Sequence, residues 1–222
     1  MPDAQPLQLP LRMRKAARTR LALLDALVER LRERPFSKIT VRSLCAEVHI
    51  SEPTFFKHFP AKEDLLVFFV QLWSVGLAVR ADDEALSGHE LITLVFDETA
   101  RQMRSAPRVM HEIIAHQMRL EAPPKLAAPS VAELAKRFPD EPRAWTMKPV
   151  PIQDLLRGGL ERARDRGELP ADISLTDATW ALVAIFFGVP ASTRSTSHVS
   201  RRYRSAVALV WSGLQNDEER SR

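Results

Sequence analysis

Hydrophobic residues recur at steps of three and four along most of this chain, and no other feature of the sequence constrains its fold more. This spacing places apolar side chains on one face of a helix. Signals for strands are nearly absent, because β-branched residues rarely alternate with polar ones and only seven glycines are available for turns. We therefore expect an all-α chain. The expected helices cover residues 14–34, 41–48, 51–59, 64–80, 89–104, 108–120, 131–138, 152–166, 175–187 and 198–215.

A proline-rich stretch from residue 122 to 151 interrupts the helical pattern and leaves room for one short helix. Such a long irregular segment in a compact domain is often functional or mobile. Further along the chain, Gly167 stands where a left-handed residue would end a helix. Ser174 lies three residues before Asp177, which predicts the start of the next helix.

Positive charge is concentrated at the N-terminal end of the chain. Residues 1–60 hold 11 Lys and Arg against 6 Asp and Glu, whereas residues 61–222 hold 21 against 22. Two interpretations of this surplus remain open, a solvated and charge-rich first helix or a surface that binds a polyanion.

The cysteine content and the hydropathy pattern bear on where the protein functions. Cys45 is the single cysteine, which rules out an internal disulfide and fits a reducing compartment. We identify no secretory stretch at the start, and we expect the longest apolar run, residues 178–191, to be too short for a bilayer. The expectation is a cytoplasmic protein with no membrane partner.

Two very short helices are expected between residues 35 and 63. Thr40 can cap the first and Ser51 the second. Pro53 is tolerated because it lies in the first turn of its helix, where a backbone N–H would lack a partner. Phe55 and Phe59 stand four residues apart and would anchor the second helix against the first long helix. The apolar face of the first short helix consists of Val41, Leu44, Cys45 and Val48.

A short helix held by a partner helix across a tight turn is what docking into the major groove of DNA requires. The first short helix places Thr40, Arg42 and Ser43 near its N-terminus, where backbone N–H groups suit a phosphate. Lys62 begins the next helix and is an equally good phosphate contact. Basic residues of the first long helix could follow the DNA backbone or the minor groove. The outward set of the second short helix is Glu52, Pro53, Thr54, Phe56, Lys57 and His58, and the basic set of the first long helix is Arg14, Lys15, Arg18 and Arg20.

The run from Ile39 to Leu66 resembles the DNA-binding segment of the TetR family of repressors. That family has Thr-Val at the start of the second helix, a hydrophobic residue and Ser ending the turn, Thr-Phe-Tyr and a Tyr/His-Phe pair in the recognition helix, and then Lys-Glu-x-Leu-Leu. The matching positions are Thr40, Val41, Ile50, Ser51, Thr54, Phe55, His58, Phe59, Lys62, Glu63, Leu65 and Leu66.

The resemblance implies a DNA-binding transcriptional regulator, a ligand-responsive repressor that binds a palindromic operator as a dimer. Its recognition helix would run from about Ser51 to Phe59. The implied partners are double-stranded operator DNA, a second copy of the chain, and a small, largely apolar effector. The expected DNA-binding residues are Arg18, Thr40, Val41, Arg42, Ser51, Glu52, Pro53, Thr54, Phe56, Lys57, His58 and Lys62.

Two positions depart from the family pattern. His49 replaces the usual glycine of the turn, and a positive φ there would cost His of the order of 1 kcal/mol. Phe56 replaces a tyrosine that contacts phosphate in the family, so a hydroxyl is lost. These departures keep open an alternative, a helical adaptor of TetR shape that acts through protein contacts.

The resemblance also implies a domain organisation. Residues 1–12 would be a disordered arm, 13–61 the helix-turn-helix domain, 62–216 a ligand-binding and dimerisation domain, and 217–222 a frayed tail. The last two long helices would form the dimer contact, although the same side chains could instead fill the core of one chain. The candidate interface residues are Trp180, Phe186, Phe187, Val207, Val210 and Trp211.

An effector pocket is expected within the bundle, where methionine suits adaptable binding. An aromatic or methionine stripe is also the ordinary composition of a core. A bound effector would act by moving the helix from about Lys62 to Arg80 and so the spacing of the two recognition helices. The candidate pocket residues are Phe69, Trp73, Phe96, Met103, Met110, Met118, Trp145 and Trp180.

The sequence contains few features that would indicate an enzyme. It contains no G-x-S-x-G, no G-x-G-x-x-G and no phosphate-binding loop motif. His111 and His116 are five residues apart, about 140° around a helix, so they do not readily share one metal. Cys45 lies on the apolar face of a short helix, where an inert thiol is expected. We expect no enzymatic activity, no cofactor and no metal.

Overall fold

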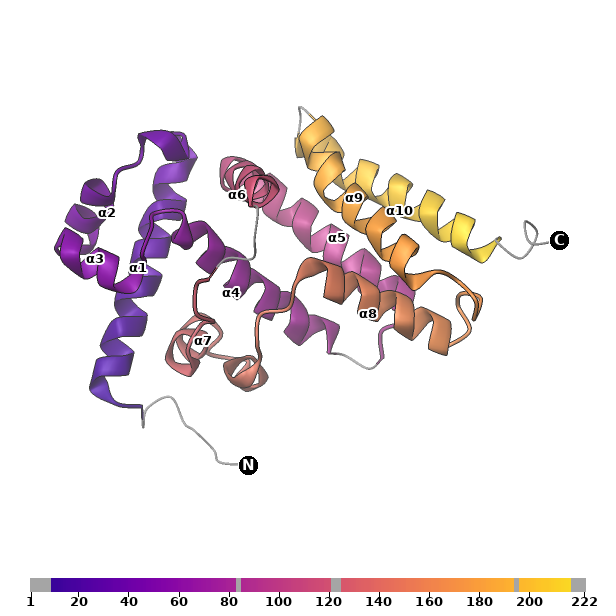
Figure 1. The fold of residues 1–222 in the computed structure, drawn as a ribbon, viewed down its shortest axis with the longest axis horizontal. Helices are drawn as coiled ribbons and strands as arrows, with labels where there is room; N and C mark the ends of the chain where they lie inside the picture. Colours follow the sequence, from indigo (N-terminus) through magenta and orange to yellow (C-terminus); the bar gives the residue numbers. More distant parts are fainter. Residues whose placement is uncertain (1–8, 83–84, 121–124, 194–195, 217–222) are drawn as a thin grey trace. The chain divides into compact units, whose positions relative to one another are not determined.

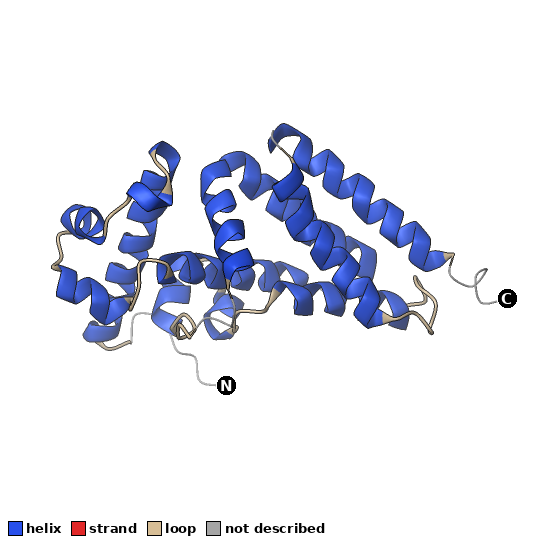
Figure 2. Cartoon of the chain, turned by 45° about the horizontal axis from the view of Figure 1, so that its top comes forward, coloured by secondary structure: helices blue, strands red, loops and turns tan. Residues whose placement is uncertain are grey.

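The computed structural model describes residues 9–82, 85–120, 125–193 and 196–216, and within these ranges it contains helices and loops but no strand (Figures 1 and 2). This confirms the expected all-α fold. The helices are α1 (Leu11–Glu33), η2 (Phe36–Lys38), α2 (Val41–Val48), α3 (Glu52–His58), α4 (Asp64–Ala81), α5 (Gly88–Ser105), α6 (Pro107–Arg119), α7 (Val131–Arg137), η3 (Pro142–Thr146), α8 (Ile152–Asp165), α9 (Leu175–Ser192), η4 (Thr196–His198) and α10 (Val199–Gln215).

The chain packs into two compact units. The first contains the described residues up to Val79 together with Arg108–Pro149, and the second contains Arg80–Pro107 and the described residues from Val150 onward. The segment Arg108–Pro149 therefore packs with the helix-turn-helix, so the packing units are discontinuous and do not follow a division at residue 61.

Both expected loose ends fall largely outside the described residues, at 1–8 and 217–222. Helix α1 begins at Leu11, three residues before the start expected from the sequence. The carbonyl of Pro10 accepts hydrogen bonds from the amides of Met13 and Arg14, which extends the helix toward the N-terminus.

In the first unit, α1 packs against α2 and α7. Its buried surface is wider than the expected stripe, since Leu23 and Leu27 are also buried and Val28 is only half-buried. The short helix α7 is fixed by a capping box, in which Ser130 accepts from the amide of Glu133 and the Glu133 side chain accepts from the amide of Ser130. The sequence predicts α7 but not η3.

In the second unit, α5, α8, α9 and α10 pack against one another. Helices α5 and α8 approach closely at Gly88, where an added Cβ would lie 2.4 Å from the carbonyl oxygen of Gly159. The Glu168 carboxylate accepts hydrogen bonds from the amides of Gly88 (2.8 Å) and His89 (3.1 Å) at the start of α5. Gly167 has a φ of 73°, as its expected role at the end of α8 requires.

Helix α9 is longer than expected, because it continues through Pro190 to Ser192 instead of ending at Phe187. Pro190 has no N–H to donate to the carbonyl of Phe186, four residues earlier. The hydroxyl of the fully buried Tyr203 on α10 donates to that same carbonyl at 2.7 Å. The hydrogen bond that the proline cannot make is thus replaced from a neighbouring helix.

This extension corrects the expectation that the apolar run is too short for a bilayer. Both α4 and α9 reach the 18-residue length and the apolar composition of a membrane span, a test that core helices of soluble proteins also pass. In α4, 61% of the apolar window is buried, compared with 28% in α9. Helix α9 therefore exposes much more apolar surface than α4 does.

Candidate nucleic-acid interface

Two side-chain caps define the start of α2 and α3. The Thr40 hydroxyl accepts a hydrogen bond from the amide of Ser43 at 3.1 Å. The Ser51 hydroxyl accepts from the amide of Thr54 at 3.4 Å and lies 2.9 Å from the Thr54 hydroxyl. Both caps agree with the sequence prediction, and Pro53 lies in the first turn of α3 as expected.

The turn between α2 and α3 depends on His49. This residue has φ 56° and ψ 47°, and it is the one non-glycine residue with a positive φ in the described part of the chain. Its amide and that of Ile50 both donate to the carbonyl of Cys45. The turn therefore needs the left-handed conformation that glycine adopts without strain, and His49 carries the cost predicted from the sequence.

An aromatic cluster holds α3 in place. Phe55 and Phe59 are fully buried, with ring centroids 5.9 Å apart, and Phe59 lies 5.6 Å from Phe68 on α4. The burial of Phe55 and Phe59 confirms their predicted role as anchors. On α2, Leu44 and Cys45 are buried while Val41 and Val48 are only half-buried, so the apolar face is narrower than expected.

Arg20 belongs to this cluster and not to the surface. Its guanidinium lies 4.8 Å from the ring centre of Phe59 and 4.4 Å from that of Phe68, and it pairs with Glu133 of α7 at 2.9 Å. Its side chain is only 14% exposed, and burial lowers its pKa although Glu133 opposes the shift. The expectation that Arg20 follows the DNA backbone is therefore wrong, because its charge is used inside the protein. Glu133, whose role the sequence analysis missed, lies far along the chain and gives no local signal.

The outward face of α3 is free of the core. Glu52, Pro53 and Lys57 are exposed, and the Phe56 ring is 49% exposed. Thr54 and His58 are half-buried. The pKa of His58 is lowered, mainly by its partial burial and secondly by the positive charge of Arg20. Helix α3 is fixed by its buried face. Its outward face presents one carboxylate, one ammonium, small polar groups and one aromatic ring.

The N-terminal turn of α2 adjoins this face. Arg42 is exposed, and Ser43 donates its hydroxyl to the carbonyl of Thr40 at 2.8 Å. Arg30 of α1 pairs with Glu47 at 2.7 Å and donates to the carbonyl of Ser43, which ties α2 to α1. The structure thus brings Thr40, Val41 and Arg42 together at one helix start, while Arg18 is exposed on α1.

Lys62 has a different environment from the expected one. Its ammonium donates to the carbonyls of Phe36 (2.9 Å) and Ile39 (2.8 Å) and lies 4.1 Å from the centre of the Phe36 ring. On the other side, the amide of Phe36 donates to the Glu112 carboxylate of α6 at 3.1 Å. Two of the three donors of Lys62 are therefore engaged inside the protein, and Glu112 joins α6 to the helix-turn-helix.

The remaining candidate groups for chemistry are isolated. Among the described residues, no three His, Cys, Asp or Glu side chains are grouped closely enough to hold a metal. Cys45 is 3% exposed, and burial raises the pKa of its thiol, in line with the expected inert cysteine. Burial also lowers the pKa of His116.

The large apolar side chains expected around an effector are divided between core and surface. Phe96 packs edge-on against Tyr203 and Phe186, with ring centroids at 4.9 and 6.1 Å, in the interior of the second unit. Met118 and Trp180 are 66% and 63% exposed, so within this chain they do not line an enclosed cavity. Met103 and Met110 are buried, and Phe69, Trp73 and Trp145 are half-buried.

The candidate interface residues are divided in a similar way. Phe186 and Val207 are only 6% and 5% exposed, because both lie in the core of the second unit, and this corrects their placement on an open surface. Phe187, Val210 and Trp211 are partly exposed, and the Trp211 ring lies 4.6 Å from that of His89.

Comparison with known proteins agrees with this geometry. Residues 23–67 match the family model of bacterial regulatory proteins of the tetR family. No curated protein matches the chain in sequence. The matched segment contains the C-terminal part of α1 from Leu23 onward, both short helices and the start of α4, which is the helix-turn-helix with the helices that support it.

Solved structures share the fold over nearly the whole chain. The Thermus thermophilus FadR, a TetR family transcriptional repressor in complex with lauroyl-CoA, has a TM-score of 0.63 at 20% identity, covering 88% of this chain and 94% of that one. Salmonella enterica GusR has a TM-score of 0.58 at 23% identity and covers 95% and 99%. CprB of S. coelicolor A3(2), a TetR family protein, has a TM-score of 0.56 at 18% identity and covers 90% of each. The helix-turn-helix of this chain therefore matches the tetR family of bacterial regulatory proteins over residues 23–67, and the chain shares the fold of solved TetR-family proteins.

Proposed function

We propose that this chain is a transcriptional regulator of the TetR family, a ligand-responsive repressor that binds a palindromic operator as a homodimer, with α3 as the recognition helix. The observation that carries the proposal is the two-sided character of α3. One side is anchored by the buried Phe55, and the other presents Thr54, Phe56 and Lys57 outward. A rigidly held helix with such a face suits the reading of base edges in the major groove.

The phosphate contacts would come from the surroundings of α3. The N-terminal amides of α2, with the side chains of Thr40 and Arg42, suit one phosphate, and Arg18 on α1 suits another. Ser51, Glu52, Pro53 and His58 complete the proposed contact surface. Lys62 would act mainly by fixing η2 against the start of α4, with its third N–H donor available to the DNA backbone.

Dimerisation through α9 and α10 is supported by their exposed apolar surface. Trp180 on α9 is 63% exposed and Leu209 on α10 is 75% exposed, and only 28% of the apolar window of α9 is buried within the chain, so these two helices offer apolar surface that a second copy would cover. A twofold dimer would present two copies of α3, and a palindromic operator is the DNA sequence that matches such symmetry. Phe187, Val210 and Trp211 would belong to the same surface.

The proposed effector is a small, largely apolar molecule. Lauroyl-CoA in the FadR structure shows that one protein of this fold takes a ligand with a long apolar part. In this chain we propose a site within the helical bundle and a cytoplasmic location, where promoter DNA is accessible.

Titration of labelled duplex DNA tests the central part of the proposal. The probe is the intergenic DNA beside the gene of this protein, with an unrelated duplex of equal length as reference, followed by fluorescence anisotropy across a series of salt concentrations. We expect preferential binding to the intergenic duplex that weakens steeply as salt rises, because binding releases counterions from the phosphates. Replacing Lys57 by Ala should reduce the preference, while Lys125→Ala, the loss of another exposed lysine, should not.

A second candidate function is an adaptor that acts through protein contacts, and the exposed ring of Phe56 favours it. A half-exposed phenyl group without a hydroxyl is suited to an apolar partner surface as well as to DNA. Equal and weak affinity for every duplex at low salt would support the adaptor and contradict the repressor.

A further inference from the structure

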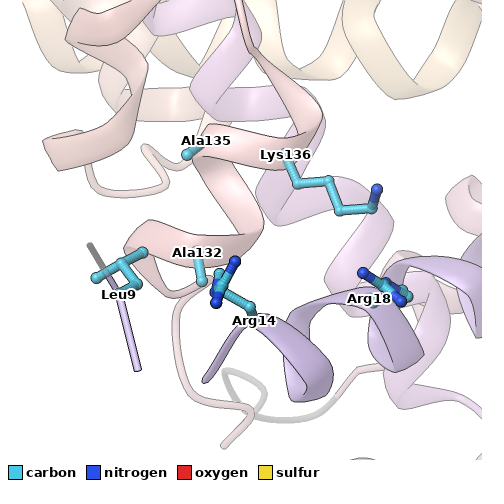
Figure 3. A pocket seen from close by; sticks show the side chains of 6 residues that line it. All are labelled: Leu9, Arg14, Arg18, Ala132, Ala135 and Lys136. Atoms are coloured by element: carbon cyan, nitrogen blue, oxygen red, sulfur yellow. The ribbon is translucent and has the colours of Figure 1, made fainter. Parts of the chain in front are cut away.

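A cavity of about 180 Å³ lies in the first unit, between α1 and α7. Figure 3 shows its lining, with two arginines from α1 and three residues from α7 around a common space. None of these residues is among the candidates for the effector pocket in the bundle. The lining consists of Leu9, Arg14, Arg18, Ala132, Ala135 and Lys136.

Small side chains on α7 explain the space. Ala132 and Ala135 are three residues apart, share one face of the short helix, and are each only 6% exposed. Nearby, the Arg20–Glu133 ion pair holds α7 to α1. Alanines on a helix fixed in this way leave a hollow that their own side chains do not fill.

The charge around this hollow is uncompensated within the described part of the chain. Arg14 and Arg18 are four residues apart on one face of α1, and Lys136 adds a third cation. None of the three makes an ion pair or a side-chain hydrogen bond to another described residue.

Glu133 of α7 does not neutralise these three cations. Glu133 uses one carboxylate oxygen for Arg20 and the other for the amide and hydroxyl of Ser130. Three neighbouring cations repel one another unless an anion lies between them.

We propose that the α1–α7 cavity binds a small organic anion. Its carboxylate or phosphate meets Arg14, Arg18 and Lys136, and its apolar body fills the space over Ala132 and Ala135. The apolar floor favours an organic anion over a phosphate of the DNA backbone, which has no apolar body to bury. The volume is below the roughly 300 Å³ at which pockets for drug-sized ligands begin, so the ligand is compact.

Calorimetric titration of the full-length protein without DNA tests the site, and it does not depend on the proposed operator binding. The probes are benzoate, its neutral analogue benzyl alcohol, and inorganic phosphate, which lacks an apolar body. We expect benzoate to bind at least tenfold more tightly than either of the others. Absence of benzoate binding, or equal binding of benzyl alcohol, would overturn the proposal, as would phosphate binding as tightly as benzoate.

Substitutions then locate the binding. The double variant Arg14→Gln/Lys136→Gln should lower the affinity for benzoate at least tenfold. Ala135→Met should lower it by the same amount, because the larger side chain fills the cavity without changing its charge. Lys125→Gln removes an exposed lysine elsewhere in the first unit and should leave binding unchanged. Unaltered benzoate affinity in both cavity variants contradicts the assignment. If the double variant binds duplex DNA more weakly and benzoate does not bind to the wild type, Arg14 and Lys136 serve the DNA backbone and the small-molecule proposal fails.

Discussion

The helix-turn-helix and the α9–α10 pair reach stability in opposite ways. The first is built from very short helices whose positions depend on polar contacts, such as Lys62 with two backbone carbonyls and Arg20 with Glu133. The second consists of long apolar helices that leave Trp180 and Leu209 exposed. The helix-turn-helix is therefore held by contacts within one chain, whereas α9 and α10 leave apolar surface exposed.

The largest expected effect concerns the exposed apolar surface of α9 and α10. Replacing Trp180 and Leu209 together by Glu should convert a dimer into a monomer and raise the dimer Kd at least about 100-fold, since burial of one large apolar side chain is worth about 1.5–3 kcal/mol. Sedimentation equilibrium measures the mass. Met118→Glu changes an equally exposed apolar residue of α6 and should leave the dimer intact. A wild-type mass of one chain at micromolar concentration contradicts this part of the account.

The next effect concerns the polar contacts of the helix-turn-helix. Lys62→Met keeps the length of the side chain but removes its ammonium, so two backbone carbonyls lose their donor. We expect a loss of about 1–3 kcal/mol in the free energy of unfolding, measured with urea. Lys57→Met on the exposed face of α3 is the control and should change stability by less than about 0.5 kcal/mol. Equal stability of the two variants would show that the Lys62 contacts add little.

A smaller effect is expected at the turn between α2 and α3. His49→Gly should stabilise the protein by up to about 1 kcal/mol, because glycine adopts the left-handed conformation without the Cβ clash. The gain should appear as a higher Tm, whereas His49→Ala should bring none. Destabilisation by the glycine would mean that the imidazole makes a compensating contribution.

The smallest effect concerns pH. The pKa of His58 is lowered in the folded protein by partial burial and by Arg20 and Lys57, with Glu133 acting in the opposite direction. The unfolded chain therefore binds a proton more readily, and this contribution to stability is present above the unfolded pKa of about 6.5 and is lost as the pH falls toward the folded value. We expect urea unfolding at pH 5 to show lower stability than at pH 7.5, with a slightly smaller difference in His58→Gln. The same pH dependence in both proteins would assign the effect to other groups, among them His116, whose pKa is lowered as well.

The sequence predicted well those features that depend on local contacts. The caps at Thr40 and Ser51, the buried Phe55 and Phe59, and the strained turn at His49 all follow from residue type and spacing within a few positions. Each involves backbone groups close in sequence, so a local pattern contains the information needed to predict it.

Features that depend on distant residues were missed. The continuation of α9 through Pro190 depends on a hydroxyl of α10, and the burial of Arg20 depends on Glu133 of α7. The cavity beside Arg14 and Arg18 forms only because α7 lies against α1. A single sequence does not show which distant segments meet, so a cation on an amphipathic helix is readily taken for a surface residue.

Selection from a random pool of duplex DNA tests most directly the claim that the outward face of α3 reads DNA sequence. We predict that the wild type enriches an inverted repeat, that Thr54→Ala and Lys57→Ala change the preferred bases within each half-site, and that Arg42→Ala lowers affinity without changing them. The same preferred sequence in the wild type and in both α3 variants, or no enrichment by the wild type, would contradict it.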